Sequence, residues 1–139
     1  WGQAAIRLGM AFASEDIVTI MNKVKYPYNI NTLTQQQAIS ALRDQEQTDK
    51  QVKFLIQERQ RMSAAIRMLP LCENVYPSDA NFLLVKTLNA QSIYDTLVKR
   101  GIIVRNRNKI TLCDNCLRIT IGTKTENNEL LAALRDIRG

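Results

Sequence analysis

The stretch GIIVRNRNKITLCDNCLRITIG (residues 101–122) carries the clearest structural signal of the chain. The apolar run at its start predicts a strand over 102–105. At its end, apolar residues alternate with Arg118 and Thr120, and this period of two predicts a strand over 117–122 with one apolar face. Because the two strands are consecutive and joined by a polar loop, we expect them to pair as an antiparallel hairpin.

Patterns before and after this stretch predict the rest of a small domain. An apolar run over 81–86 predicts another strand, and a compact apolar stripe over 93–98 predicts a helix followed by Gly101 as its C′ residue. A last stripe over 130–137 predicts a closing helix. With a helical region before residue 70, the order is helix, strand, helix, strand, strand, helix. This order predicts an α+β domain with a small, mainly antiparallel sheet covered by helices.

The N-terminal segment has a different character. The apolar run over 4–13 predicts a strand buried on both faces, with Arg7 as its only charge. Ser14 is expected to cap a short helix over 15–24. A YPYN connector at 26–29 ends that helix, because proline disfavours helix at the residue before it. The connector is also a candidate boundary between two bodies.

A long helical region follows the connector. From Thr34 to Pro70, apolar residues recur at three- and four-residue steps, which predicts two helices, or one long bent helix, packed on the sheet. The predicted organisation is therefore a segment over 1–30 that ends in the connector, and a domain over 31–139.

The composition indicates an ordinary globular protein with excess positive charge. The net charge of +6 is spread along the chain, which suits anionic ligands without implying nucleic acid. No apolar run approaches the roughly 20 residues of a membrane span, and the start shows no secretory-signal pattern. We therefore expect neither a membrane nor a nucleic-acid partner.

The three cysteines are Cys72, Cys113 and Cys116. An odd count in a chain with an adequate core indicates reduced thiols and a cytoplasmic protein. Cys113 and Cys116 have the spacing of a metal knuckle, but a closed zinc site needs four Cys or His ligands and the sequence has no His. We expect no metal site, and a redox role is the alternative to a plain pair of loop thiols.

Three arginines are candidate binding residues. Arg105 ends the first hairpin strand and Arg118 starts the second, so both should lie near the loop end of the hairpin. Like charges across a sheet repel, and a phosphate or carboxylate would relieve that repulsion. The alternative is two solvated surface arginines. Arg7, inside an apolar strand, must pair with a carboxylate or serve a ligand such as phosphate, and the residues alone leave both readings open.

Four segments occur in an order and at separations that match one known family: WGQAAIRLGM (1–10), SDANF (78–82), GIIVR (101–105) and CLRITIGT (116–123). They are similar to the segment after the Schiff-base lysine, the strand-entry motif and the two C-terminal arginine motifs of the histidinol-phosphate aminotransferases. These are class II, fold-type I enzymes that use pyridoxal 5′-phosphate (PLP). The resemblance covers essentially the whole chain.

The resemblance implies roles for the three arginines. It implies that Arg7 contacts the cofactor phosphate, that Arg118 binds the anionic head of the substrate, and that Arg105 is a second anion contact near the substrate phosphate. The Schiff-base lysine would lie just before Trp1. The chain is then a C-terminal fragment, with 1–30 as the remnant of the large domain and the rest as the small domain, and is expected to be inactive alone.

The family's reaction interconverts histidinol phosphate and 2-oxoglutarate with imidazole-acetol phosphate and glutamate, in histidine biosynthesis, on a homodimer. A related PLP enzyme, such as a threonine-phosphate decarboxylase or an aromatic aminotransferase, is an alternative. A basic α+β module that binds RNA or a protein through its sheet is an alternative of another class. Without the large domain, apolar surface over 1–30 should make the fragment self-associate.

Overall fold

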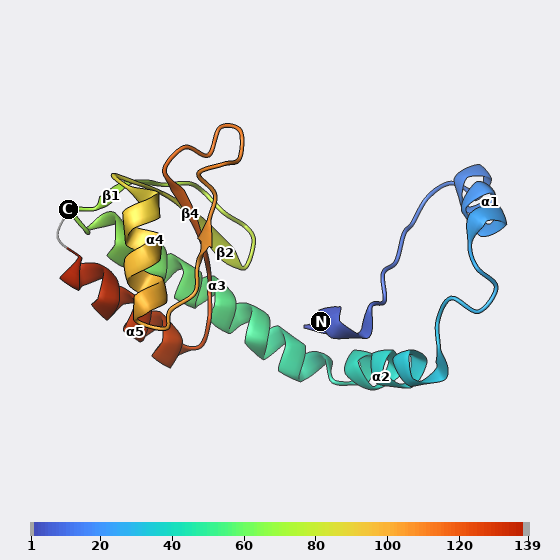
Figure 1. Ribbon diagram of the computed structural model, residues 1–139. Helices are drawn as coiled ribbons and strands as arrows, with labels where there is room; N and C mark the ends of the chain where they lie inside the picture. The colour runs from blue at the N-terminus through green and yellow to red at the C-terminus, as the bar shows by residue number, and fades with distance from the viewer. Residues whose placement is uncertain (1, 138–139) are drawn as a thin grey trace. The chain divides into compact units, whose positions relative to one another are not determined.

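The computed structural model describes residues 2–137, and Figure 1 shows its helices and strands. The chain divides into two compact units, Trp1–Gln51 and Val52–Gly139, of which the second contains the sheet and the hydrophobic core. In chain order the elements are the 3-10 helix η1 (Ala4–Ile6), α1 (Glu15–Val24), α2 (Thr32–Arg43), α3 (Gln45–Arg67), β1 (Cys72–Val75), β2 (Phe82–Thr87), α4 (Ala90–Lys99), β3 (Arg105–Asn106), β4 (Cys116–Thr120) and α5 (Lys124–Asp136).

The four strands of the second unit form one antiparallel sheet in the order β1-β2-β4-β3. The central strands β2 and β4 pair with Leu84 opposite Arg118. β3 pairs with β4 at one edge of the sheet, so the predicted hairpin is confirmed. The predicted α+β class with a small antiparallel sheet is confirmed as well.

One face of this sheet carries the hydrophobic core. Leu83 and Val85 of β2 and Leu117 and Ile119 of β4 are all buried, at 1–2% exposure. The helices of the unit complete the same core with Met62 and Ile66 from α3, Ile93 and Leu97 from α4, and Leu130, Leu131 and Leu134 from α5. Because side chains alternate along a strand, Arg118 lies on the opposite face, as its position between two apolar residues predicted.

Caps fix the helices next to the sheet. Thr123 begins α5 with a capping box, in which the Thr123 hydroxyl accepts from the backbone N–H of Glu126, and the Glu126 carboxylate accepts from the backbone N–H of Thr123 at 2.7 Å. Gly101 follows α4 with a φ of +76° and donates its N–H to the oxygen of Val98 at 2.9 Å. Glycine adopts this left-handed conformation without a steric cost, so the predicted C′ role is confirmed.

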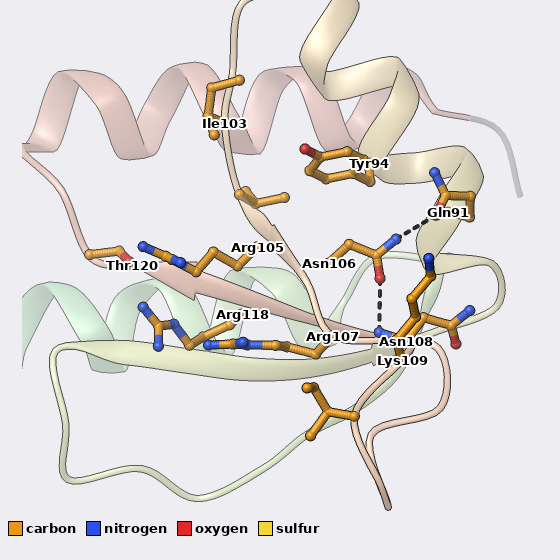
Figure 2. A pocket seen from close by; sticks show the side chains of 12 residues that line it. Gln91, Tyr94, Ile103, Arg105, Asn106, Arg107, Asn108, Lys109, Arg118 and Thr120 are labelled. Atoms are coloured by element: carbon orange, nitrogen blue, oxygen red, sulfur yellow. Dashed lines mark hydrogen bonds between the residues drawn. The ribbon is translucent and has the colours of Figure 1, made fainter.

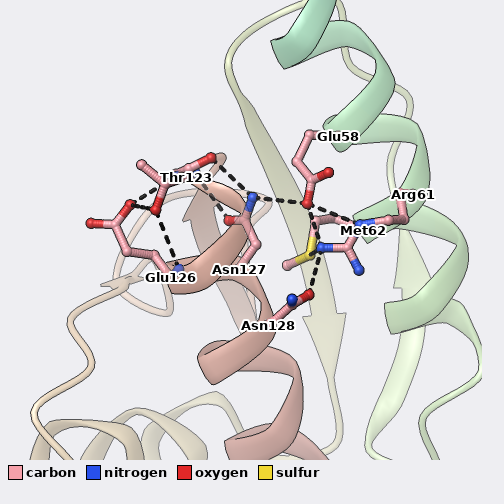
Figure 3. Close-up of polar contacts among 8 residues, drawn as sticks. Glu58, Arg61, Met62, Thr123, Glu126, Asn127 and Asn128 are labelled. Atoms are coloured by element: carbon pink, nitrogen blue, oxygen red, sulfur yellow. Dashed lines mark hydrogen bonds and ion pairs between the residues drawn. The ribbon is translucent and has the colours of Figure 1, made fainter.

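A buried polar network joins α3 to α5 (Figure 3). Glu58 of α3 is only 6% exposed, and it accepts hydrogen bonds from the Arg61 guanidinium at 2.9 Å and from the Asn127 amide at 3.3 Å. Asn127 in turn bonds the backbone N–H and C=O of Gly122, at 3.0 Å each. The hydrogen bond from Arg61 holds the pKa of Glu58 below its usual range, although burial opposes it.

Two parts of the sheet differ from the prediction. The segment 102–105 contributes only Arg105 to β3, because the N–H of Ile102 donates to the last turn of α4 and Val104 is buried without strand pairing. β1 was not predicted. Its sequence CENV (72–75) has no run of apolar residues, and pairing with β2 makes it a strand.

The first unit corrects the prediction for 4–13. This segment contains η1 and is otherwise irregular, its residues are exposed or half-buried, and residues 2–51 include no strand to pair with it. A strand covered on both faces requires neighbours that residues 2–51 do not provide. The helix over 15–24, by contrast, has the predicted bounds.

The long helical region is two helices rather than one bent helix. Asp44 leaves the helical conformation between α2 and α3, and α3 ends at Arg67, shortly before Pro70. Within residues 2–137, no helix has the length and apolar character that would let it cross a bilayer. The division of the chain into 1–30 and 31–139 stays a prediction.

Candidate functional site

The two hairpin arginines face each other at the edge of the sheet. β3 and β4 pair with Arg105 directly opposite Arg118. Like charges in a directly opposed pair are destabilising. Neither guanidinium forms an ion pair with a carboxylate among the described residues. The pair therefore presents two positive charges that the fold itself does not neutralise.

Arg118 rests against an aromatic ring. Its guanidinium carbon lies 4.8 Å from the centroid of the Phe82 ring, a cation–π contact. Phe82 pairs with Thr120, so it is a diagonal neighbour of Arg118 on the same face of the sheet. The Nε of Arg118 is buried, and no acceptor within residues 2–137 reaches it. Such an unpaired buried donor costs about 1–3 kcal/mol.

An open pocket of ≈ 710 Å³ surrounds the arginine pair, and Figure 2 shows its lining. The pocket is formed by α4, the segment 103–110 and β4. None of its lining side chains is a carboxylate, and four are cationic: Arg105, Arg107, Lys109 and Arg118. The pocket is therefore suited to an anion rather than to a metal ion or a cationic ligand.

Neutral amides hold the segment after β3 in place. The side-chain NH2 of Asn106 donates to Gln91 of α4 at 2.8 Å, and its oxygen accepts from the N–H of Asn108 at 2.9 Å. The side-chain oxygen of Asn108 accepts from the N–H of Asn115 at 2.7 Å. Because these groups carry no charge, they fix the pocket wall without competing for an anion.

Arg7 belongs to the first unit and is exposed, so the premise that it is a buried charge is wrong. It ends η1 in the left-handed conformation, with φ of 57°. Arg7 lines a separate pocket of ≈ 720 Å³ together with polar residues such as Asn31 and Thr34, and its guanidinium has no ion-pair partner among the described residues. Trp1, the aromatic residue of the same sequence motif, lies outside the described residues.

The cysteines do not gather into a metal centre. Within residues 2–137 no three His, Cys, Asp or Glu side chains are placed to hold a metal ion. Burial raises the pKa of Cys72 and of Cys116, so neither thiol is activated as a nucleophile. Cys113 closes a turn in which its carbonyl accepts from the N–H of Cys116 at 3.0 Å.

The lining of the pocket includes residues that the sequence analysis does not name as candidates. Arg107 and Lys109 were passed over, and so were Gln91 and Tyr94 of α4. For Arg107 a signal was present, because it stands two residues after Arg105 and a period of two places both on one face of an extended chain. The α4 residues had no such signal, since the contact depends on how the helix packs.

The model of the aminotransferase class I and II family matches residues 1–134 of the chain. The chain belongs to this family. The resemblance seen in its four sequence segments is thereby confirmed. The alternative of a basic module that binds RNA or protein receives no support from the match.

Curated relatives of this aminotransferase chain cover its whole length. The histidinol-phosphate aminotransferase of Bacteroides thetaiotaomicron is 54% identical over 139 residues, 100% of this chain, and that of Parabacteroides distasonis is 50% identical over 138 residues, 99% of this chain. The chain spans 40% of the length of each. Among solved structures, the histidinol-phosphate aminotransferase of Sinorhizobium meliloti in complex with pyridoxal-5′-phosphate has a TM-score of 0.86 and 25% identity, covering 97% of this chain and 37% of that one.

Proposed function

We propose that this chain forms part of a PLP-dependent aminotransferase that interconverts histidinol phosphate and 2-oxoglutarate with imidazole-acetol phosphate and glutamate. The observation that carries the proposal is the direct pairing of Arg105 with Arg118 in a pocket without carboxylates. The names of the relatives, at 50–54% identity, favour this reaction over that of a related decarboxylase or aromatic aminotransferase.

Arg118 and Arg105 are proposed to bind the anionic end of the substrate. Each substrate of the reaction presents a phosphate or a carboxylate, and a guanidinium donates two parallel hydrogen bonds to either group. The Arg118 side chain lines the pocket and has no ion-pair partner among the described residues, so no carboxylate of the protein competes with the substrate for it. Holding the anion orients the Cα–H bond of the amino substrate, and orientation of this kind accounts for several kcal/mol of a catalysed barrier, about 7–11 in favourable cases.

Arg7 is proposed to contact the phosphate of the cofactor. Its chemistry fits that group, because it is an exposed guanidinium without an ion-pair partner among the described residues. When bound, PLP supplies the electron sink for amino-group transfer. The contribution of this chain is then electrostatic: Arg7 fixes the cofactor phosphate, and Arg105 and Arg118 fix the substrate.

The proposal is tested by replacing Arg118 in the complete enzyme that contains this sequence. Arg118→Gln should lower kcat/KM for histidinol phosphate by roughly 10- to 100-fold, because one charge-assisted contact is lost. Arg135→Gln is the matched control, since it removes the same charge from an exposed position of α5. Transamination that is undiminished by Arg118→Gln would contradict the assignment.

The 139-residue chain by itself is predicted to be inactive, because the lysine that the family uses would lie before Trp1. Incubation with PLP, histidinol phosphate and 2-oxoglutarate should yield no glutamate. A specific lysine adduct of PLP, trapped by reduction of the isolated chain, would argue against this placement of the lysine. The homodimer and the cytoplasmic location also stay predictions.

A further inference from the structure

A third guanidinium lies beside the proposed anion-binding pair. Arg107 lines the same pocket as Arg105 and Arg118, and Figure 2 shows its side chain extending toward Arg118. We propose that Arg107 is a specificity-determining residue that favours a phosphate-bearing substrate over a dicarboxylate, an inference that rests on the proposed function. The paired arginines serve both kinds of substrate, whereas Arg107 distinguishes between them.

The backbone of Arg107 is fixed in register with β4. Its N–H donates to the carbonyl of Cys116 at 2.8 Å, which extends the β3–β4 pairing by one residue beyond Asn106. Its carbonyl accepts from the N–H of Ile110, also at 2.8 Å. With this register, the alternation of the strand places Arg107 and Arg105 on the same face, and Arg107 diagonal to Arg118.

The side chain of Arg107 has no structural partner to occupy it. It is half-buried, and no hydrogen bond or ion pair to its guanidinium occurs among residues 2–137. The side chains of its neighbours make the hydrogen bonds of this segment instead. Asn106 bonds Gln91 and the N–H of Asn108, and Asn108 accepts from the N–H of Asn115. A half-buried cation near two others therefore remains available to a ligand.

The charge and oxygen count of the ligand decide how much the third cation contributes. A carboxylate carries one charge on two oxygens, and two guanidinium forks already saturate it. A phosphate monoester carries about −1.5 to −2 at pH 7 on three strongly accepting oxygens, so it has an oxygen and nearly a full charge left for a third donor. Arg107 should thus stabilise a bound phosphate selectively.

The test compares two substrates in the complete enzyme. Arg107→Gln should reduce kcat/KM for histidinol phosphate about tenfold or more, and should change kcat/KM for glutamate by less than about threefold. The inhibition constant of inorganic phosphate should rise about tenfold as well. Arg107→Lys, which keeps the charge but not the fork, should give intermediate values. Arg135→Gln is the control for loss of charge elsewhere, and thermal melting of each variant checks that it is folded.

The outcomes separate the two proposals. Equal losses for both substrates, or no loss for either, would overturn the specificity role of Arg107 while leaving the aminotransferase proposal intact. If the unaltered enzyme transaminates neither substrate, the proposed function itself fails. A selective loss for histidinol phosphate, partly restored by Arg107→Lys, is the result we expect.

Discussion

At the scale of single residues, Arg118 is held by a contact that does not neutralise its charge. The guanidinium carbon of Arg118 lies over the Phe82 ring, 4.8 Å from its centroid. A cation–π contact takes up none of the five N–H donors of an arginine in a hydrogen bond. An aromatic neighbour can therefore fix the orientation of Arg118 where a carboxylate neighbour would neutralise it and exclude the anion.

Glu58 shows the opposite arrangement, because its charge is paired inside the protein by hydrogen bonds from Arg61 and Asn127. Glu58→Gln should lower the free energy of unfolding of the chain by about 1–3 kcal/mol at pH 7, because the Arg61 guanidinium then meets a neutral amide oxygen instead of a carboxylate and the ion pair is lost. Since the pKa of Glu58 is lowered in the folded state, its stabilisation is present above the unfolded value, about 4.3, and is lost as pH falls through the folded value.

The stability gap between wild type and Glu58→Gln should therefore close as the pH is lowered from 7 to about 3. Urea unfolding at several pH values measures this gap. Glu129→Gln, at an exposed position of α5, is the matched control and should show little difference at any pH. A gap of constant size across this range would show that the Glu58 charge is not what stabilises the network.

Only some residues of the site could be predicted from the sequence. Arg105 and Arg118 could be expected together, because consecutive strands and a period of two restrict their register. The contact of Phe82 with Arg118 could not, since β2 and β4 are separated by α4 and β3 in the sequence and their pairing follows from packing. The exposure of Arg7 could not be foreseen either, because an apolar run does not reveal whether strands exist to cover it.

At the scale of elements, α5 depends on its first turn. Thr123→Ala should destabilise the chain by about 1 kcal/mol, because the backbone N–H of Glu126 loses its acceptor and the capping box opens. Thermal or urea unfolding measures the change. Thr123→Ser should retain most of the stability, and Thr125→Ala, at an exposed position within the first turn of the same helix, should be nearly neutral. Equal destabilisation by Thr125→Ala would point to helix propensity rather than capping.

Elements with local signals were the predictable ones. α1, α4, β4 and α5 have the apolar periodicity or capping residues that mark a helix or strand, and the structure contains all four, although α5 begins at Lys124, before the predicted stripe over 130–137. β1 lacked any such signal, because its pairing with β2 rather than its own composition makes it a strand. The segment 102–104 had the composition of a strand, but the backbone N–H of Ile102 bonds the last turn of α4, and the Val104 side chain belongs to the core.

At the scale of the whole molecule, the two units differ in how they bury apolar side chains. Among residues 2–137, all of the buried core residues lie between Met62 and Leu134, and neither α1 nor α2 contains a buried residue. The exposed apolar residues of α1 include Ile17, Ile20 and Val24, which follow the spacing of one helical face. Apolar surface of this kind is typical of a segment that another polypeptide covers.

The isolated chain is therefore predicted to self-associate through α1. Sedimentation velocity should reveal oligomers that grow with concentration, and the double substitution Ile20→Lys and Val24→Lys should shift the chain toward monomer by placing charges on the apolar face. Met68→Lys is the control, because Met68 is 83% exposed in the second unit. A chain that sediments as a monomer at high concentration, or one dispersed equally by Met68→Lys, would contradict the prediction.

The two outer strands of the sheet have a further consequence for the protein in solution. β3 is only two residues long and includes Arg105, and β1 has a register irregularity between Cys72 and Asn74. Outer strands expose unpaired backbone groups onto which another chain can add, and brevity, charge and irregular register all oppose such addition. Arg105, which is proposed to bind substrate, thus also opposes the addition of another chain at this edge of the sheet. Replacing Arg105 with an apolar residue would remove the proposed substrate contact and the charge at this edge of the sheet at once.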